Sequence, residues 1–396
     1  MPKDNEAAEL VNKRFGADVV IPARNVKRIP RVATGLTSMD MALKGGLPMG
    51  VPVMLSGRKS SGKSAWSYMV LGQATKQYGG FPLILQSEPG FDWEWAEQCG
   101  LKRSGCLYFD GTKYNIKENL QFVLDVMRKD KPPAILMDSL SAISDDPDQS
   151  LLDSKSHGGR AKPINEFFRK MTGAVDREKP PLMIFVEHLH PDINSPHGRL
   201  ITTGGETKGY MAVIELRFRV ESVTKEIMDD VLTYDGKKPE WVVQRRIVWE
   251  LQKSKIGADG AVGTFQLGIR QTPFCEPGEI SDWEELLQQA IMLKQIRKKG
   301  AWYIFGETKF QGIHNLKAGL PAEALREVIA NPRQADGEGE REEDGGPEGA
   351  GVGEPKKQAG RRRGRKQEGD TVPRGGEDDN REVSVPEDGV VAEDQA

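Results

Sequence analysis

A glycine loop between an apolar run and a helix-forming segment constrains this chain more than any other feature. Residues 57–64 read Gly-Arg-Lys-Ser-Ser-Gly-Lys-Ser, which is the spacing of a phosphate-binding P-loop. Residues 51–56 before the loop predict a buried strand, and residues 65–77 after it predict a helix. This order of strand, loop and helix is the context in which a P-loop works. A flexible Gly/Ser-rich turn is the alternative interpretation of the loop alone.

The P-loop predicts ATP and Mg²⁺ as ligands. Gly57 and Gly62 allow the backbone to curl around phosphates, and backbone N–H groups at the helix N-terminus supply positive potential. Lys63 is expected to reach the β- and γ-phosphates, and the Ser64 hydroxyl to bind Mg²⁺. The predicted nucleotide-binding loop is Gly57, Arg58, Lys59, Ser60, Ser61, Gly62, Lys63 and Ser64.

Alternating strand and helix patterns continue from about residue 34 to residue 270. Apolar runs at residues 82–85, 134–137 and 182–186 predict fully buried parallel strands. Residues 211–220, 246–251 and 264–269 alternate, as later strands of the same sheet should. We therefore predict an α/β fold of the P-loop NTPase class, with a mainly parallel twisted sheet and helices on both faces.

Amino-acid composition indicates a reducing compartment and distinguishes the last part of the chain from the rest. The three cysteines, Cys99, Cys106 and Cys275, have no metal-ligand spacing, which predicts inert thiols in a reducing cytoplasm. We expect no membrane span and no signal peptide. Residues 333–396 carry about seven more acidic than basic side chains and few apolar ones, so we expect a disordered charged tail.

Two acidic residues follow predicted strands at the edge of the sheet where ligands bind. Asp138 follows the strand at residues 134–137 and is the candidate second Mg²⁺ ligand; the alternative is a turn-forming aspartate. Glu88 follows the strand at residues 83–87 and can activate the attacking water; the alternative is a solvent-exposed loop glutamate. Trp95 can stack on adenine or serve as a core aromatic residue.

Several motifs together resemble the RecA recombinase family over roughly residues 5–320. Residues 34–50, from Thr34-Gly35-Leu36 to Met49-Gly50, resemble the segment before the family's P-loop, and Glu88-Pro89-Gly90-Phe91-Asp92 resembles its catalytic-glutamate turn, which adds Asp92 to the nucleotide site. The end of the family's second DNA-binding loop is matched by Thr202-Thr203-Gly204-Gly205, and a lysine pair that reaches the neighbouring subunit's ATP is matched by Lys253-Ser254-Lys255-Ile256. The family's small C-terminal domain is matched by Lys299-Gly300-Ala301-Trp302-Tyr303, and the N-terminal element that links protomers by Lys13-Arg14-Phe15-Gly16.

The resemblance implies that Lys253 and Lys255 reach the ATP of a neighbouring subunit. Two lysines two positions apart on a strand point to the same side, and there they would act like an arginine finger supplied in trans. A solvated, charged strand edge is the alternative. ATP between subunits in head-to-tail contact would produce a helical homo-oligomeric filament.

The resemblance also implies DNA contacts from two loops, residues 144–159 and 190–205. Lys162 and Arg169, seven positions apart after the first loop, share one helix face and match basic positions of the family's primary DNA site. In the second loop we expect contacts from Arg199, Thr203, Gly204 and Gly205. For each basic residue, the alternative to a DNA contact is a solvated charge on the protein surface. The expected partners are single-stranded and double-stranded DNA.

Three positions depart from the family pattern. His188 stands where bacterial members carry the glutamine that senses the γ-phosphate, and we still count it among the catalytic residues because histidine can donate to phosphate. Glu206 replaces an asparagine, and near Gly268 and Ile269 a base-stacking tyrosine is missing. These departures indicate a divergent recombinase, and both a bacterial and a phage-encoded origin stay open.

We divide the chain into an N-terminal oligomerisation helix and strand at residues 1–33, an ATPase core at 34–270, a small α+β C-terminal domain at 271–332, and the tail. An acidic tail that competes with DNA is one hypothesis, and a solubilising tail is the other. The predicted function is a cytoplasmic, DNA-dependent ATPase that forms filaments on single-stranded DNA and exchanges homologous strands. The alternative is a RecA-like paralog or ring ATPase that remodels DNA without strand exchange.

Overall fold

The computed structural model describes residues 6–16, 20–21, 23–143, 161–191, 200–202, 209, 211–227, 238–256, 259–273 and 275–331. The chain divides into residues 1–336 and residues 337–396, and the second unit lies wholly outside the described residues. The predictions for the tail, most of both DNA loops, Arg199, Thr203, Gly204, Gly205 and Glu206 also lie outside them.

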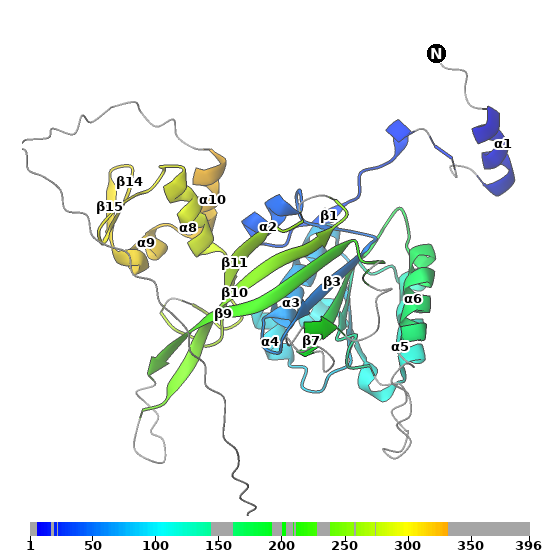
Figure 1. Ribbon diagram of the computed structural model, residues 1–396, viewed down its shortest axis with the longest axis horizontal. Coiled ribbons are helices and arrows are strands. Elements are labelled where there is room, and N and C mark those ends of the chain that lie inside the picture. Colours follow the sequence, from blue (N-terminus) through cyan, green and yellow to red (C-terminus); the bar gives the residue numbers. More distant parts are fainter. Residues whose placement is uncertain are drawn as a thin grey trace, which may run out of the picture. The chain divides into compact units, whose positions relative to one another are not determined.

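The main feature is a ten-stranded sheet in which six neighbouring strands run parallel (Figure 1). Its order is β12-β11-β10-β9-β3-β7-β6-β4-β5, and β8 pairs with β7. The predicted mainly parallel α/β fold is confirmed. The strands are β3 (Pro52–Gly57), β4 (Leu83–Gln86), β5 (Leu107–Asp110), β6 (Ala134–Asp138), β7 (Leu182–Pro191), β8 (Leu200–Thr202), β9 (Ile214–Ile227), β10 (Glu240–Ser254), β11 (Val262–Gly268) and β12 (Ile280–Ser281).

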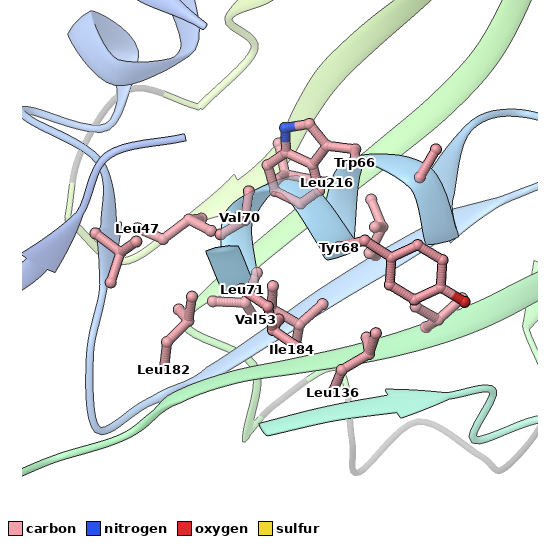
Figure 2. Close-up of a cluster of buried hydrophobic side chains, with 14 of the residues drawn as sticks. Leu47, Val53, Trp66, Tyr68, Val70, Leu71, Leu136, Leu182, Ile184 and Leu216 are labelled. Atoms are coloured by element: carbon pink, nitrogen blue, oxygen red, sulfur yellow. The ribbon is translucent and has the colours of Figure 1, made fainter. Parts of the chain in front are cut away.

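Helices cover both faces of this sheet because alternate strand residues belong to two separate cores. Val53 and Ile184 face the core under α3, whereas Met54 and Phe185 face the core under α5 and α6. Figure 2 shows Val70 and Leu71 of α3 packed over the strands of the first core. The helices of this region are α2 (Thr37–Ala42), α3 (Lys63–Tyr78), α4 (Trp93–Gln98), α5 (Ile116–Lys129) and α6 (Ala161–Ala174), with short 3₁₀ turns at η2 (Arg103–Gly105) and η3 (Gly111–Lys113).

The C-terminal unit has its own small core and its own antiparallel sheet. Trp283, Leu316 and Leu325 are buried at its centre. Asp282 joins it to α2, because its carboxylate accepts from the Thr37 N–H (2.7 Å) and from Arg326 (2.7 Å). The first helix of this unit, α8, ends at Met292. The elements are α8 (Trp283–Met292), β13 (Arg297–Lys299), β14 (Trp302–Phe305), β15 (Thr308–Gln311), α9 (Gly312–Gly319) and α10 (Ala322–Ala330).

The N-terminal segment contains the expected helix, α1 (Glu6–Phe15), and the strand expected near residues 19–21 does not form within the described part of this chain. Val20 and Ile21 belong to no strand. The Asn12 side chain accepts from the Val20 N–H (2.7 Å) and donates to the Val20 carbonyl (2.8 Å), so the groups that a strand partner would use are engaged. The turn η1 (Ala23–Asn25) and a two-stranded sheet, β1 (Arg31–Val32) with β2 (Leu47–Pro48), follow.

No described helix is long and apolar enough to cross a membrane. The proposed domain boundaries stay a prediction.

Candidate active site

The P-loop joins the central strand β3 to α3, and its two glycines are required for different reasons. β3 pairs in parallel with β7 on one side and with β9 on the other. A Cβ on Gly57 would lie 2.5 Å from both the Phe218 carbonyl oxygen and Ser61 Oγ. Gly62 has φ of +82°, and a Cβ there would lie 2.5 Å from Ile247 Cδ1. Gly57 is therefore fixed by close packing, and Gly62 by both backbone conformation and packing.

Lys63 begins α3 and holds its ammonium group inside the loop. Nζ donates to the carbonyl oxygens of Gly57 (2.9 Å) and Arg58 (2.9 Å), and only 4% of the residue is exposed. Burial lowers the Lys63 pKa to about 8, against the opposing effect of Asp138 and Glu88. A cation in this position faces the space that the loop encloses, as binding of a polyphosphate requires.

Asp138 and Ser64 form the second part of the site. Asp138 is the last residue of β6, and its buried carboxylate accepts a hydrogen bond from Ser64. Desolvation raises the Asp138 pKa, and the Ser64 bond opposes this rise. A hydroxyl and a carboxylate are oxygen ligands of the kind that Mg²⁺ takes together with nucleotide phosphates. The residues present therefore fit the predicted ion.

Glu88 lies in the turn after β4 and is held by two side chains. Its Oε1 accepts from Ser139 Oγ (2.5 Å) and lies 2.5 Å from His188 Nε2. The hydrogen bond with His188 is the main cause that lowers the Glu88 pKa to about 2; partial burial opposes it, and Ser139 adds to it. The carboxylate is thus ionised at neutral pH, and a third of it remains exposed. An ionised, partly exposed carboxylate can accept a hydrogen bond from water and so orient it.

Sheet register explains why these groups meet. His188 on β7 pairs with Gly57 on β3, and Gln86 on β4 pairs with Asp138 on β6. The carboxyl ends of four parallel strands therefore bring the P-loop, Glu88, Asp138 and His188 to one edge. Sequence reasoning missed Ser139, and also Ser141, whose Oγ accepts from the His188 backbone N–H (3.1 Å). Their position within three residues after Asp138 was the available signal.

Asp92 directly precedes α4, and Trp95 lies on this helix. The Asp92 side chain caps the helix by accepting from the Glu94 N–H (2.9 Å) and is exposed. Trp95 is half-buried and packs against the first core. Packing accounts for the buried part of the ring, so nucleotide contact by either residue stays a prediction.

The lysine pair is arranged less regularly than expected. β10 ends at Ser254, so Lys255 lies one residue beyond the strand, although its N–H still donates to the Val213 carbonyl (2.9 Å). Lys253 Nζ donates to the Gly209 carbonyl and lies 3.8 Å from Glu215 Oε1. Lys255 is exposed and Lys253 half-buried, and their contact with a neighbouring subunit stays a prediction.

Lys162 and Arg169 are exposed on α6, as predicted. A groove of about 450 Å³ between α5 and α6 adds two lysines that sequence reasoning missed, Lys117 and Lys170. Lys170 pairs with Glu166 (2.7 Å), which also lines this groove. The roles of these side chains in DNA binding stay predictions.

Comparison with known proteins identifies the family. The family model of the RecA N-terminal domain matches residues 4–256. Protein RecA of Chlorobium limicola is 25% identical over 323 residues, which cover 80% of this chain and 86% of that protein. Protein RecA of Aquifex pyrophilus is 27% identical over 339 residues, which cover 84% and 91%. A crystal structure of the RadB recombinase aligns with a TM-score of 0.45 and 17% identity, over 60% of this chain and 97% of that one. The family match spans more than half of the sequence, and the chain therefore belongs to the RecA family.

Proposed function

We propose that this P-loop NTPase is a DNA-dependent ATPase that forms filaments on single-stranded DNA and exchanges homologous strands. The observation that carries the proposal is the convergence of Lys63, Asp138 and Glu88 at one edge of the sheet. Anchor, metal ligand and base are the three groups that ATP hydrolysis needs. The protein's place in a family whose curated members are named RecA supports the assignment of this chemistry to DNA recombination and repair.

Each residue has a distinct role in the proposed hydrolysis. Lys63 binds the β- and γ-phosphates of ATP, and its ammonium then exchanges loop carbonyls for phosphate oxygens. Ser64 and Asp138 would hold Mg²⁺, and the ion would supply positive charge that offsets the charge of the phosphates. Glu88 accepts a proton from the attacking water. Lys253 and Lys255 of an adjacent protomer stabilise the charge that develops on the γ-phosphate.

His188 provides the proposed link to DNA. In the described state its ring contacts Glu88, and its Nδ1 is buried with no hydrogen-bond partner among the described residues. β7 continues from His188 into the segment at residues 190–205 that we expect to contact DNA. Binding of DNA to that segment would move His188 between Glu88 and the γ-phosphate, and the rate of hydrolysis would then depend on DNA.

ATP hydrolysis measured with and without single-stranded DNA, together with a strand-exchange assay, tests the proposal. We expect DNA to stimulate hydrolysis and a homologous duplex to be paired. Lys63→Ala should abolish both activities because the phosphate anchor is lost. DNA-stimulated hydrolysis without homologous pairing would favour the paralog or ring ATPase instead.

A further inference from the structure

Two serines extend the contact between β4 and β6 beyond the end of the sheet. The last ladder pair is Gln86 with Asp138. After it, the Ser87 N–H donates to the Asp138 carbonyl (2.9 Å), and Ser87 Oγ donates to the Ser139 carbonyl (2.5 Å). Ser139 Oγ in turn donates to Glu88 Oε1 (2.5 Å). Both serines are buried: 6% of Ser87 and 0% of Ser139 is exposed. We call Ser87 and Ser139 the serine clip.

We propose that Ser139 is a positioning residue for the base Glu88: its hydrogen bond fixes the carboxylate that orients the attacking water. This inference rests on the proposed function, because it takes Glu88 as the base. Oε1 receives the bonds from Ser139 and His188. Oε2 has no hydrogen-bond partner among the described residues and is therefore the oxygen left for the attacking water.

Glu88 needs such support because of its location. A glutamate side chain has three rotatable bonds, and its terminal torsion is broad. Glu88 also lies in a turn outside the strand, where the backbone ladder no longer holds it. A hydrogen bond from a fully buried hydroxyl restricts the carboxylate, and a base that is displaced by 1 Å loses much of its effect.

Ser139 and His188 have different parts in holding Glu88. His188 is on the strand that enters the predicted DNA-binding segment, so its contact with Glu88 is the one expected to change. Ser139 directly follows Asp138 and is attached to β4 through Ser87, so its contact should persist in every state. The clip thus keeps a fixed distance between the base and the metal ligand while His188 moves.

Ser139→Ala tests the proposal in the full-length protein with ATP, Mg²⁺ and single-stranded DNA. A hydrogen bond to a charged group corresponds to a roughly 10- to 100-fold change in rate, so kcat should fall by that factor. The KM for ATP should change less than about twofold, because phosphate binding uses other residues. Loss of a donor to the ionised carboxylate raises the Glu88 pKa, so the acidic limb of the kcat profile should move to higher pH.

Matched variants separate positioning from folding. Ser139→Thr keeps the hydroxyl and should restore both kcat and the acidic limb. Ser139→Cys keeps a similar volume with a weak donor and should behave like Ser139→Ala, which covers the case in which alanine destabilises the fold. Ser87→Ala removes the bond to the Ser139 carbonyl but leaves the carboxylate contact, so it should lower the Tm without moving the acidic limb. Ser104→Ala, at an exposed site, serves as the unchanged control.

The outcomes distinguish this inference from the proposed function. Wild-type kcat and an unmoved acidic limb in Ser139→Ala, with Glu88→Gln inactive, would overturn the inference alone. An equal loss of kcat in Ser139→Ala and Ser87→Ala without a pH shift would also overturn it, because the role would then be structural. A Glu88→Gln variant as active as wild type would overturn both the inference and the choice of base.

Discussion

Replacing Glu88 with glutamine separates the charge of this side chain from its shape. Glutamine has the same length and keeps an oxygen that can accept from Ser139 Oγ, which lies 2.5 Å from Glu88 Oε1. It cannot accept a proton from water. We therefore expect Glu88→Gln to fold and bind ATP but to hydrolyse it about 10²- to 10⁴-fold more slowly, the usual contribution of a general base.

The same variant should carry a small, pH-dependent stability cost. Lowering of the Glu88 pKa from 4.5 to about 2 corresponds to roughly 3 kcal/mol of preference for the ionised form. Because 31% of the side chain is exposed, solvent screening reduces this to roughly 1 kcal/mol. A depressed carboxyl pKa stabilises the fold above the unfolded value near 4.5, and this stabilisation is lost as the pH falls toward 2.

Two measurements test these magnitudes. Single-turnover hydrolysis with bound ATP reports the chemical step, and urea unfolding at pH 7 and pH 4 reports the stability difference from wild type. We expect a large rate loss, a difference of roughly 1 kcal/mol at pH 7 and a smaller one at pH 4. A rate within tenfold of wild type would refute the assignment of Glu88 as base. A stability difference that does not shrink at pH 4 would refute the hydrogen-bonding account of its pKa.

Three further substitutions have expected outcomes. Gly62→Ala forces a side chain into φ of +82° and against Ile247, and should lower stability by about 1–3 kcal/mol and weaken ATP binding, measured by Tm and titration. Asp282→Ala leaves the Arg326 guanidinium without its 2.7 Å partner and should cost about 2–3 kcal/mol in urea unfolding. The Lys253→Ala protein by itself should lose DNA-stimulated hydrolysis. An equal mixture with Glu88→Gln should restore about a quarter of the sites, because each interface takes one group from each protomer. No recovery of hydrolysis in the mixture would contradict a shared site.

The local sequence pattern was sufficient to predict the strands that are buried on both faces of the sheet. The apolar runs at β4, β6 and β7 and the glycine spacing of the P-loop predicted both the sheet and its ligand-binding edge. The long hairpin was underestimated, since β9 extends to Ile227 and β10 begins at Glu240. The outer half of β9 is exposed on both faces, so its residues do not alternate, and only pairing with β10 defines the strand.

Contacts between distant residues were the other limit. Glu88 and His188 are 100 positions apart, and Glu88 and Ser139 are 51 apart. Strand order brings them together, and neither contact leaves a local pattern in the sequence. Resemblance to a family suggested His188 as a residue near the γ-phosphate, but only the fold showed that its ring lies against Glu88.

Strand exchange between a single strand and a fluorescently labelled homologous duplex, followed in time with ATP and Mg²⁺, tests the central claim most directly. We predict that the wild-type protein transfers the labelled strand only when the sequences are homologous, and that Lys63→Ala does not transfer it. Robust DNA-stimulated ATP hydrolysis without transfer of the homologous strand would contradict the account.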